Sequence, residues 1–305
     1  MKFFRFNDNR LGVLEGSSFK DVSHALSVLP PLHWPVPQGD HFFRHFQDVR
    51  QAVRSSLNTA PVVSAETICF LSPVVNASKI IAAPLNYAKH VTEVGNDPQI
   101  HAGTHSFEHD GFQTPIDKLG LFLKAGSSVV GPSEGITLTY PERRTDHEVE
   151  LVAVIEKEGK NIPESQAMNH IAGYCIGLDM TVRGPEDRSF RKSPDSYTVL
   201  GPLFVTADEI DDPGQLDISI SVNGEVKQSA NTRDLTVNLP RLIAIASSCY
   251  TLYPGDIIMT GTPDGVAPIA AGDKIVATIA SLGELRVLVL AGTPSTGVHG
   301  RRAVT

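Results

Sequence analysis

A chain of 305 residues is long enough for one large domain, or for one domain with a smaller appendage. Hydrophobic residues make up 41% of it and charged residues 20%, which excludes a disordered or collagen-like chain. The net charge of -8 argues against nucleic acid as a partner, and no apolar run approaches the ~20 residues of a membrane helix. The N-terminus lacks the apolar stretch of a signal peptide, so we expect a cytoplasmic protein that binds neither membrane nor nucleic acid.

Residues 1–75 are expected to form a small N-terminal α+β domain. Lys2–Phe6 and Leu11–Leu14 flank Asn7-Asp8-Asn9, a pattern that predicts a hairpin. Asp40 is a suitable N-cap, and the apolar residues after it recur at helical spacing. These residues predict one continuous helix: Phe42, Phe46, Val49, Val53 and Leu57.

From Lys79 onward the chain reads mainly as strands, and we expect a second domain over residues 76–291 followed by a mobile tail over residues 292–305. Asn223-Gly224 between Leu216–Val222 and Glu225–Ser229 predicts a tight hairpin, because both turn residues accept a positive φ. Further along, the pattern predicts a helix from Asn238 to about Leu252 and a buried strand at Ile257–Met259. Three widely spaced cysteines lie in apolar stretches and are predicted to be core residues: Cys69, Cys175 and Cys249.

Acidic residues stand at the entrance of a predicted buried strand. Glu148 and Glu150 precede Leu151–Ile155, and side chains two apart on a strand share a face. Two neighbouring carboxylates repel each other when they lose solvent, and a divalent cation between them removes that cost. Asp179 follows a second apolar run and offers a third oxygen, which favours Mg²⁺ or Mn²⁺. The alternative is a frayed strand end with solvated glutamates.

His90 and Glu93 are three residues apart, so they share a face if the segment is helical. A carboxylate beside an imidazole fixes its orientation and raises its basicity, as a general base requires. The alternative is an ordinary surface pair. A group of cations follows Asp179 and can neutralise an anionic substrate, although each alone is typical of a solvated loop: Arg183, Arg188, Arg191 and Lys192.

These residues, in their order along the chain, resemble the fumarylacetoacetate hydrolase family, and the resemblance runs from about Lys79 to Leu290. The matching positions are Asn86-Tyr87, His90, Glu93, Phe122-Leu123-Lys124, Ser127–Pro132, His147–Leu151, Gly173-Tyr174, Asp179, Lys192–Asp195, Gly201-Pro202, Pro254–Ile258, Thr260–Pro263 and Gly265-Val266. The ordered set is far more specific than any one motif.

The resemblance implies an α+β, mostly β fold, a rolled β-sandwich or barrel that forms a homodimer. It implies Mg²⁺ or Mn²⁺ on three carboxylates, Glu148, Glu150 and Asp179, and a His90–Glu93 dyad that activates water. Lys192 matches the family's active-site lysine, Arg183 a substrate-contacting arginine, and Thr262 the threonine that meets the substrate carboxylate. The implied activity is metal-dependent hydrolysis of a C–C bond in an acylpyruvate, a small anionic 2-oxo acid. Such an enzyme serves aromatic catabolism.

Departures from the family pattern leave other activities open. Leu178 stands where many members carry Asn, Gly184–Asp187 replaces Asp-x-Gln, and Ala125-Gly126 replaces a common proline pair. Because the substrate-contacting positions differ, three alternatives stay open. They are a 2-oxo acid decarboxylase, an isomerase or hydratase, and a non-catalytic 2-oxo acid binder. The His- and Gly-rich segment 96–120 is longer than expected, which suggests a lid.

Two short motifs suggest other hydrolases. His105–His109 fits the His-x-x-Glu-His pattern of zinc peptidases, but the glycines and proline around it disfavour the helix that this site needs. Ser189–Lys192 fits Ser-x-x-Lys, in which a lysine activates a serine nucleophile. The companion motifs Ser-Asp-Asn and Lys-Thr-Gly do not occur, so we interpret the match as chance.

Overall fold

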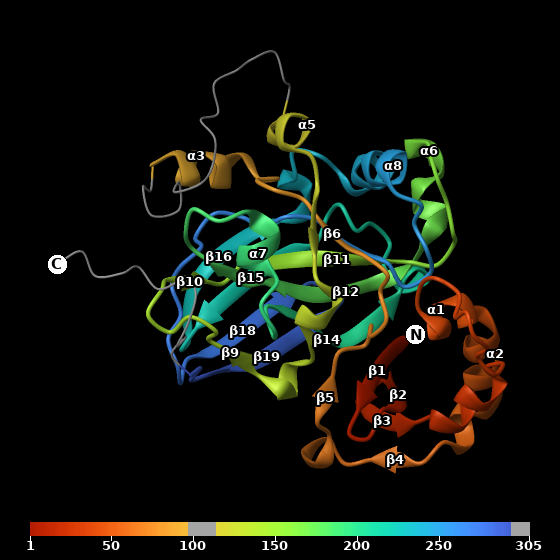
Figure 1. Cartoon of the computed structure of the whole chain (residues 1–305). Coiled ribbons are helices and arrows are strands. Elements are labelled where there is room, and N and C mark those ends of the chain that lie inside the picture. The colour runs from red at the N-terminus through yellow and green to blue at the C-terminus, as the bar shows by residue number, and fades with distance from the viewer. Residues whose placement is uncertain (97–113, 294–305) are drawn as a thin grey trace.

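The computed structural model describes residues 1–96 and 114–293 (Figure 1). A twelve-stranded sheet runs through the molecule. Its strands are β1 (Lys2–Phe6), β2 (Arg10–Glu15), β3 (Ser18–Asp21), β4 (Val62–Val63), β5 (Phe70–Leu71), β6 (Ile80–Ala82), β7 (Phe122–Lys124), β8 (Val129–Val130), β11 (Val149–Ile155), β12 (Ile171–Asp179), β14 (Thr198–Thr206) and β17 (Ile257–Met259). Along its main path the order is β4-β3-β2-β1-β14-β12-β11-β17-β6-β7.

A second, five-stranded sheet has the order β16-β15-β18-β19-β9. Its strands are β9 (Ile136–Thr137), β15 (Asp217–Val222), β16 (Glu225–Asn231), β18 (Lys274–Ile279) and β19 (Gly283–Leu290). A small ladder joins β10 (Thr145–Asp146) to β13 (Thr181–Val182). Leu151 and Ile176 of the large sheet share one buried core with Ile218 and Ile279 of the second. The predicted mostly β sandwich is confirmed, with both large sheets open over the described residues.

Seven helices lie around the sheets in the described ranges, as Figure 1 shows. They are α1 (His41–Arg44), α2 (Phe46–Ser56), α3 (Ala88–Asn96), α5 (Pro115–Leu119), α6 (Glu164–Ala167), α7 (Arg188–Lys192) and α8 (Leu239–Cys249). The carboxylate of Asp40 caps α1, as expected, by accepting hydrogen bonds from Phe42 N and Phe43 N. The predicted continuous helix is wrong at one point, since His45 leaves the helical region at φ -112° and ψ 25° and separates α1 from α2.

The first 75 residues extend the large sheet. The predicted hairpin is present, and β1 pairs on its other side with β14 through Lys2↔Val205 and Phe3↔Phe204. The Phe43 and Phe204 rings lie 5.1 Å apart between centroids in one apolar cluster. The segment is therefore joined to the rest by both backbone pairing and side-chain packing, and the division into residues 1–75, 76–291 and 292–305 stays a prediction.

The other local predictions are confirmed in part. Asn223 (φ 52°) and Gly224 (φ 86°) form the expected turn between β15 and β16. Asn238 caps α8, which ends at Cys249 because Tyr250 is extended. The prediction of three core cysteines is correct only for Cys175. Cys69 and Cys249 are exposed, the first in an irregular connection and the second on the last turn of α8.

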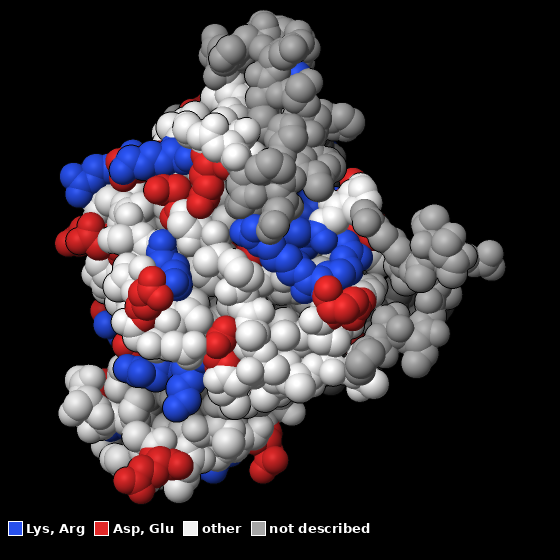
Figure 2. Space-filling model, turned by 90° about the vertical axis from the view of Figure 1, so that its left-hand side faces the viewer, with Lys and Arg blue, Asp and Glu red and all other residues white. Residues whose placement is uncertain are grey.

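Two predictions fall outside the described ranges. Residues 97–113 hold most of the proposed lid and the whole of His105–His109, and residues 294–305 hold most of the expected tail. Over residues 1–96 and 114–293, no helix has the length and apolar character needed to cross a membrane. Figure 2 shows the side of the molecule at the left of Figure 1, where Lys and Arg side chains gather in one part of the surface although the net charge of the chain is -8.

Candidate active site

The register of β11 and β12 brings three carboxylates together. The strands are antiparallel, so the beginning of β11 meets the end of β12, and Val149 pairs with Leu178. Glu148 lies just before β11 rather than on it, yet its carbonyl accepts a hydrogen bond of 2.8 Å from Asp179 N. Oxygen atoms of Glu148, Glu150 and Asp179 lie within 4.8 Å of one another, and all three residues are buried.

Two lysines pair with carboxylates of this cluster. Lys192 Nζ donates to Glu148 Oε2 (2.7 Å) and to Asp179 Oδ2 (2.6 Å). Lys124 Nζ, at the end of β7, pairs with Asp179 Oδ1 and donates to the carbonyl of Tyr197 at 2.8 Å. Sequence reasoning gave Lys124 no role. The available signal was a lysine at the end of an apolar stretch, but a single sequence does not distinguish a buried lysine from an exposed one.

The two glutamates have opposite electrostatic environments. Burial favours the neutral form of Glu148, but the ammonium of Lys192 and the guanidinium of Arg183 outweigh it and lower the pKa to about 2. Burial and the neighbouring Asp179 carboxylate raise the pKa of Glu150 well above its ordinary value. Its Oε2 accepts one hydrogen bond of 2.7 Å, from Gly261 N. The three carboxylates offer only oxygen donors, and burial disfavours the ionised form of Glu150. Both features fit a hard divalent cation such as Mg²⁺ or Mn²⁺.

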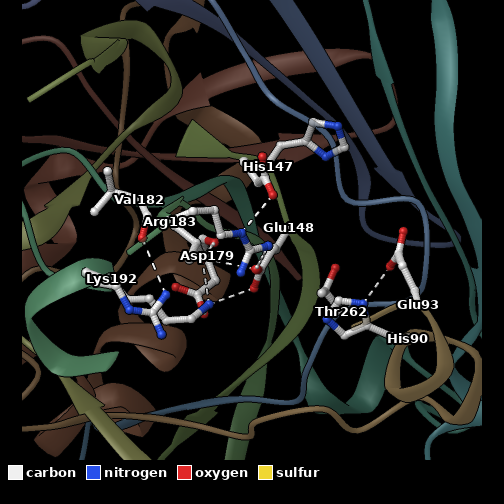
Figure 3. A network of polar contacts seen from close by, with 12 residues as sticks. His90, Glu93, His147, Glu148, Asp179, Val182, Arg183, Lys192 and Thr262 are labelled. Atoms are coloured by element: carbon white, nitrogen blue, oxygen red, sulfur yellow. Dashed lines mark hydrogen bonds and ion pairs between the residues drawn. The ribbon is translucent and has the colours of Figure 1, made fainter. Parts of the chain in front are cut away.

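A histidine–glutamate pair lies across from the carboxylates (Figure 3). His90 is buried on α3, and its Nδ1 lies 2.8 Å from Glu93 Oε2. An ionised carboxylate only accepts hydrogen bonds, so this contact selects the neutral tautomer with the proton on Nδ1 and the lone pair on Nε2. The other oxygen of Glu93 accepts a hydrogen bond of 2.9 Å from Gly265 N, which fixes the carboxylate. The pair therefore has the arrangement of an oriented base.

Thr262 is held by a buried glutamine that sequence reasoning missed. Gln228, on β16, donates from Nε2 to Thr262 Oγ1 (2.8 Å) and to the carbonyl of Pro263 (2.6 Å). Its Oε1 accepts from Val149 N at 3.1 Å and lies 3.3 Å from His147 Nδ1. Since Thr262 Oγ1 accepts the bond from Gln228, its own proton is available for a ligand. The register that places Gln228 here depends on β16, far from any motif.

Arg183 contacts carboxylates as well as the pocket. Its Nε donates to Asp146 Oδ2 (2.7 Å) and its Nη2 to Glu148 Oε1 (3.1 Å). Asp146 is fully buried and also accepts from Arg144 Nε at 2.7 Å. Asp146 was part of the acidic stretch in the sequence but had no assigned role. It holds Arg183 against Glu148, one of the three clustered carboxylates.

The predicted site residues converge on one place. One pocket is lined by most of them, namely His90, Glu148, Glu150, Arg183, Lys192 and Thr262, and the remaining two, Glu93 and Asp179, bond to lining residues. Figure 3 shows His90 and Thr262 facing this cluster. The Ser-x-x-Lys alternative is not supported, because the Ser189 hydroxyl donates to Asp187 while Lys192 is bound by Glu148 and Asp179.

Comparison with known proteins agrees with this geometry. Residues 79–290 match the family described as fumarylacetoacetate (FAA) hydrolase C-terminal. The chain belongs to the fumarylacetoacetate hydrolase family. The resemblance inferred from the ordered motifs is thereby confirmed, and the matched range is close to the one those motifs delimit.

The chain is also similar to individual members of the family. The chain is 50% identical over 289 residues to maleylpyruvate hydrolase of Aquipseudomonas alcaligenes, covering 95% of this chain and 99% of that one. It is 35% identical to a mitochondrial oxaloacetate tautomerase of Rattus norvegicus, over 77% of this chain and 72% of the relative. The crystal structure of maleylpyruvate hydrolase from Sphingobium sp. SYK-6 in complex with manganese(II) and pyruvate superposes with a TM-score of 0.79 at 36% identity, covering 96% of this chain and 100% of that one.

Proposed function

We propose that this protein is a divalent-metal-dependent hydrolase that cleaves a C–C bond in an acylpyruvate, with maleylpyruvate as the first candidate substrate. The observation that carries the proposal is the buried carboxylate cluster facing an oriented His90–Glu93 pair in one pocket. The likeness to two maleylpyruvate hydrolases supports both the reaction class and the substrate. The expected reaction converts maleylpyruvate and water into maleate and pyruvate.

Glu148, Glu150 and Asp179 would hold the metal. A bound Mg²⁺ or Mn²⁺ supplies Lewis-acid stabilisation of the negative charge that develops on the 2-oxo acid. The opposite electrostatic environments of Glu148 and Glu150 suit this role, because a cation relieves the cost of ionising the second glutamate.

Side chains of the pocket bind the substrate, transfer the proton and stabilise the oxyanion. The Thr262 hydroxyl donates a hydrogen bond to the pyruvate carboxylate, and Arg183 adds positive charge to the same pocket. His90 Nε2 removes a proton from water, which attacks the acyl carbonyl carbon, while Glu93 holds the imidazolium that forms. Lys192 stabilises the oxyanion. The bond between the acyl carbon and the pyruvate methylene breaks, and pyruvate leaves as its enolate. The enolate carbon takes up the proton that His90 removed from water, which restores the neutral imidazole.

The proposal also covers the oligomeric state, the cellular location and the role of residues 1–75. We propose a homodimer in the cytoplasm, with residues 1–75 as an appendage to the catalytic part. Sedimentation velocity across a tenfold concentration range measures the oligomeric state, and a single monomer peak at every concentration contradicts the dimer.

Pyruvate release tests the function directly. EDTA-stripped protein, with Mg²⁺ or Mn²⁺ restored, is given maleylpyruvate, fumarylpyruvate, acetylpyruvate and oxaloacetate. We expect pyruvate from the acylpyruvates only when metal is present, and a loss of about 10²–10⁴ in kcat for His90→Ala.

Other outcomes identify the alternatives. Release from oxaloacetate alone, above the free-metal background, identifies a decarboxylase. Keto–enol exchange of oxaloacetate without pyruvate release identifies a tautomerase, the activity named for the mammalian relative. Tight binding of oxalate or pyruvate without turnover of any 2-oxo acid identifies a binding protein.

A further inference from the structure

Four cations follow Asp179 in the sequence, and the structure separates them by what they bind. Lys192 is bound by Glu148, Asp179 and Thr181, and Arg183 by Asp146 and Glu148. Arg191 donates from Nε to the carbonyl of Glu186 (2.8 Å). Three of the four are therefore committed to protein oxygens.

Arg188 is different. It is the first residue of α7 and lines the same pocket as Glu148 and His90, yet no hydrogen bond or ion pair joins it to any residue in the described ranges. The side chain is only partly exposed. A partly buried guanidinium with five donors and no acceptor is costly unless an anion satisfies it.

The two acidic residues next to it in sequence make their hydrogen bonds with other groups, and Asp187 attracts Arg188 without forming a hydrogen bond or ion pair with it. Asp187 caps α7, with Oδ1 accepting from Ser189 N at 2.8 Å. Glu186 forms a two-pronged ion pair with Arg143, at 3.0 and 2.7 Å. The local chain thus supplies carboxylates to other groups and leaves Arg188 facing the pocket.

We propose that Arg188 binds the distal carboxylate of a dicarboxylic acylpyruvate and so selects diacids over acylpyruvates that end in an alkyl group. Arg183, Lys192 and Thr262 line the same pocket and are assigned above to the 2-oxo acid end of the substrate. Within the described residues Arg188 is the pocket cation that has no hydrogen bond or ion pair, so it can take a second carboxylate. A planar guanidinium matches a carboxylate with two parallel hydrogen bonds. This assignment deepens the proposed function and rests on it for the orientation of the substrate.

A matched pair of uncleavable ligands tests the assignment without turnover. 2-Oxoheptanedioate and 2-oxoheptanoate have the same chain and the same 2-oxo acid end, and only the first has a distal carboxylate. Calorimetry with Mn²⁺ present measures both dissociation constants for the wild type, Arg188→Gln and Arg188→Lys. Arg241→Gln is the control, because it removes an exposed cation that pairs with Glu164 on the helices α6 and α8.

We expect the wild type and the Arg241→Gln control to prefer the diacid by roughly tenfold to a hundredfold. Arg188→Gln should reduce this preference to about twofold or less, and Arg188→Lys should restore part of it. The assignment is overturned if the wild type shows no preference, or if Arg188→Gln keeps it.

Turnover measurements distinguish failure of the Arg188 assignment from failure of the hydrolase proposal. The ratio of kcat/KM for maleylpyruvate to that for acetylpyruvate should fall at least tenfold in Arg188→Gln. If no acylpyruvate is cleaved by the wild type but the diacid preference depends on Arg188, the hydrolase proposal fails and the Arg188 assignment stands. If acylpyruvates are cleaved and the preference is independent of Arg188, the reverse holds.

Discussion

Glu150→Gln should stabilise the metal-free protein. Glu150 is buried within 4.8 Å of two other carboxylates, and at that separation one pair of like charges repels by about 3.5 kcal/mol at an effective dielectric constant of 20. The ammonium of Lys192 offsets part of this, so we expect a net gain of roughly 1–3 kcal/mol, or about 2–6 °C in Tm. Glutamine keeps the bond from Gly261 N through its Oε1.

The gain should depend on pH in a defined direction. Burial raises the pKa of Glu150, so its neutral form stabilises the fold below the ordinary glutamate pKa, and this contribution is lost as pH rises through the folded value. The difference between variant and wild type is therefore small at acid pH and grows toward pH 8. Glu148 behaves oppositely, since its pKa of about 2 gives stability that is lost only as pH falls from about 4.5 toward 2. Measurements above pH 5 avoid that second transition.

Thermal denaturation in EDTA and in Mn²⁺ is the assay. At a hundredfold excess over Kd, metal should stabilise the wild type by about 2.7 kcal/mol and the variant far less. Glu225→Gln removes the same formal charge at a side chain that is 75% exposed and serves as the control. The reasoning is refuted if Glu150→Gln melts below the wild type in EDTA at pH 8, or if Mn²⁺ raises both proteins equally.

Three further variants probe the proposed base, the proposed substrate contact and a helix cap. His90→Ala should lose hydrolysis by about 10²–10⁴ while keeping the Tm increase on Mn²⁺ addition; normal turnover would remove it as the base. Thr262→Val should raise KM for acylpyruvates roughly tenfold with a smaller change in kcat, since it deletes one hydrogen bond to the substrate; an unchanged KM would exclude that contact. Asp40→Ala should lower the unfolding free energy by about 1–2 kcal/mol, measured in urea, because it removes the cap of α1; an unchanged midpoint would show the cap to be dispensable.

The clustering of the three carboxylates could be predicted from sequence because its signal is local. Burying a charged residue at the end of a strand costs desolvation free energy. The positions of Glu148, Glu150 and Asp179 beside apolar runs reveal this cost without knowledge of the sheet order. The register that makes Val149 face Leu178 was not predictable, since it depends on two strands separated by a long connection. The helical pairing of His90 with Glu93 was predictable for the same local reason.

The roles of Gln228 and Lys124 could not be predicted from sequence, because they depend on tertiary contacts. Gln228 belongs to the five-stranded sheet and reaches Thr262 only because that sheet packs on the carboxylate-bearing one. Lys124 reads as an ordinary polar residue until the fold buries it against Asp179. The break at His45 was missed because apolar periodicity continues through it while the backbone does not.

The charge balance of the site argues for a dianionic substrate. Four cations and four carboxylates lie around the proposed metal position in the described residues. Lys124, Lys192, Arg183 and Arg144 pair with Asp179, Glu148 and Asp146, while the fourth carboxylate, Glu150, accepts from Gly261 N. A divalent ion therefore leaves this cluster with two surplus positive charges. Two more cations line the pocket wall: Arg191, which donates to backbone carbonyls, and Arg188, which has no hydrogen bond or ion pair within the described residues. A simple acylpyruvate offsets one of these charges through its carboxylate. An acylpyruvate with a distal carboxylate offsets two, and in a partly buried pocket that difference favours the diacid.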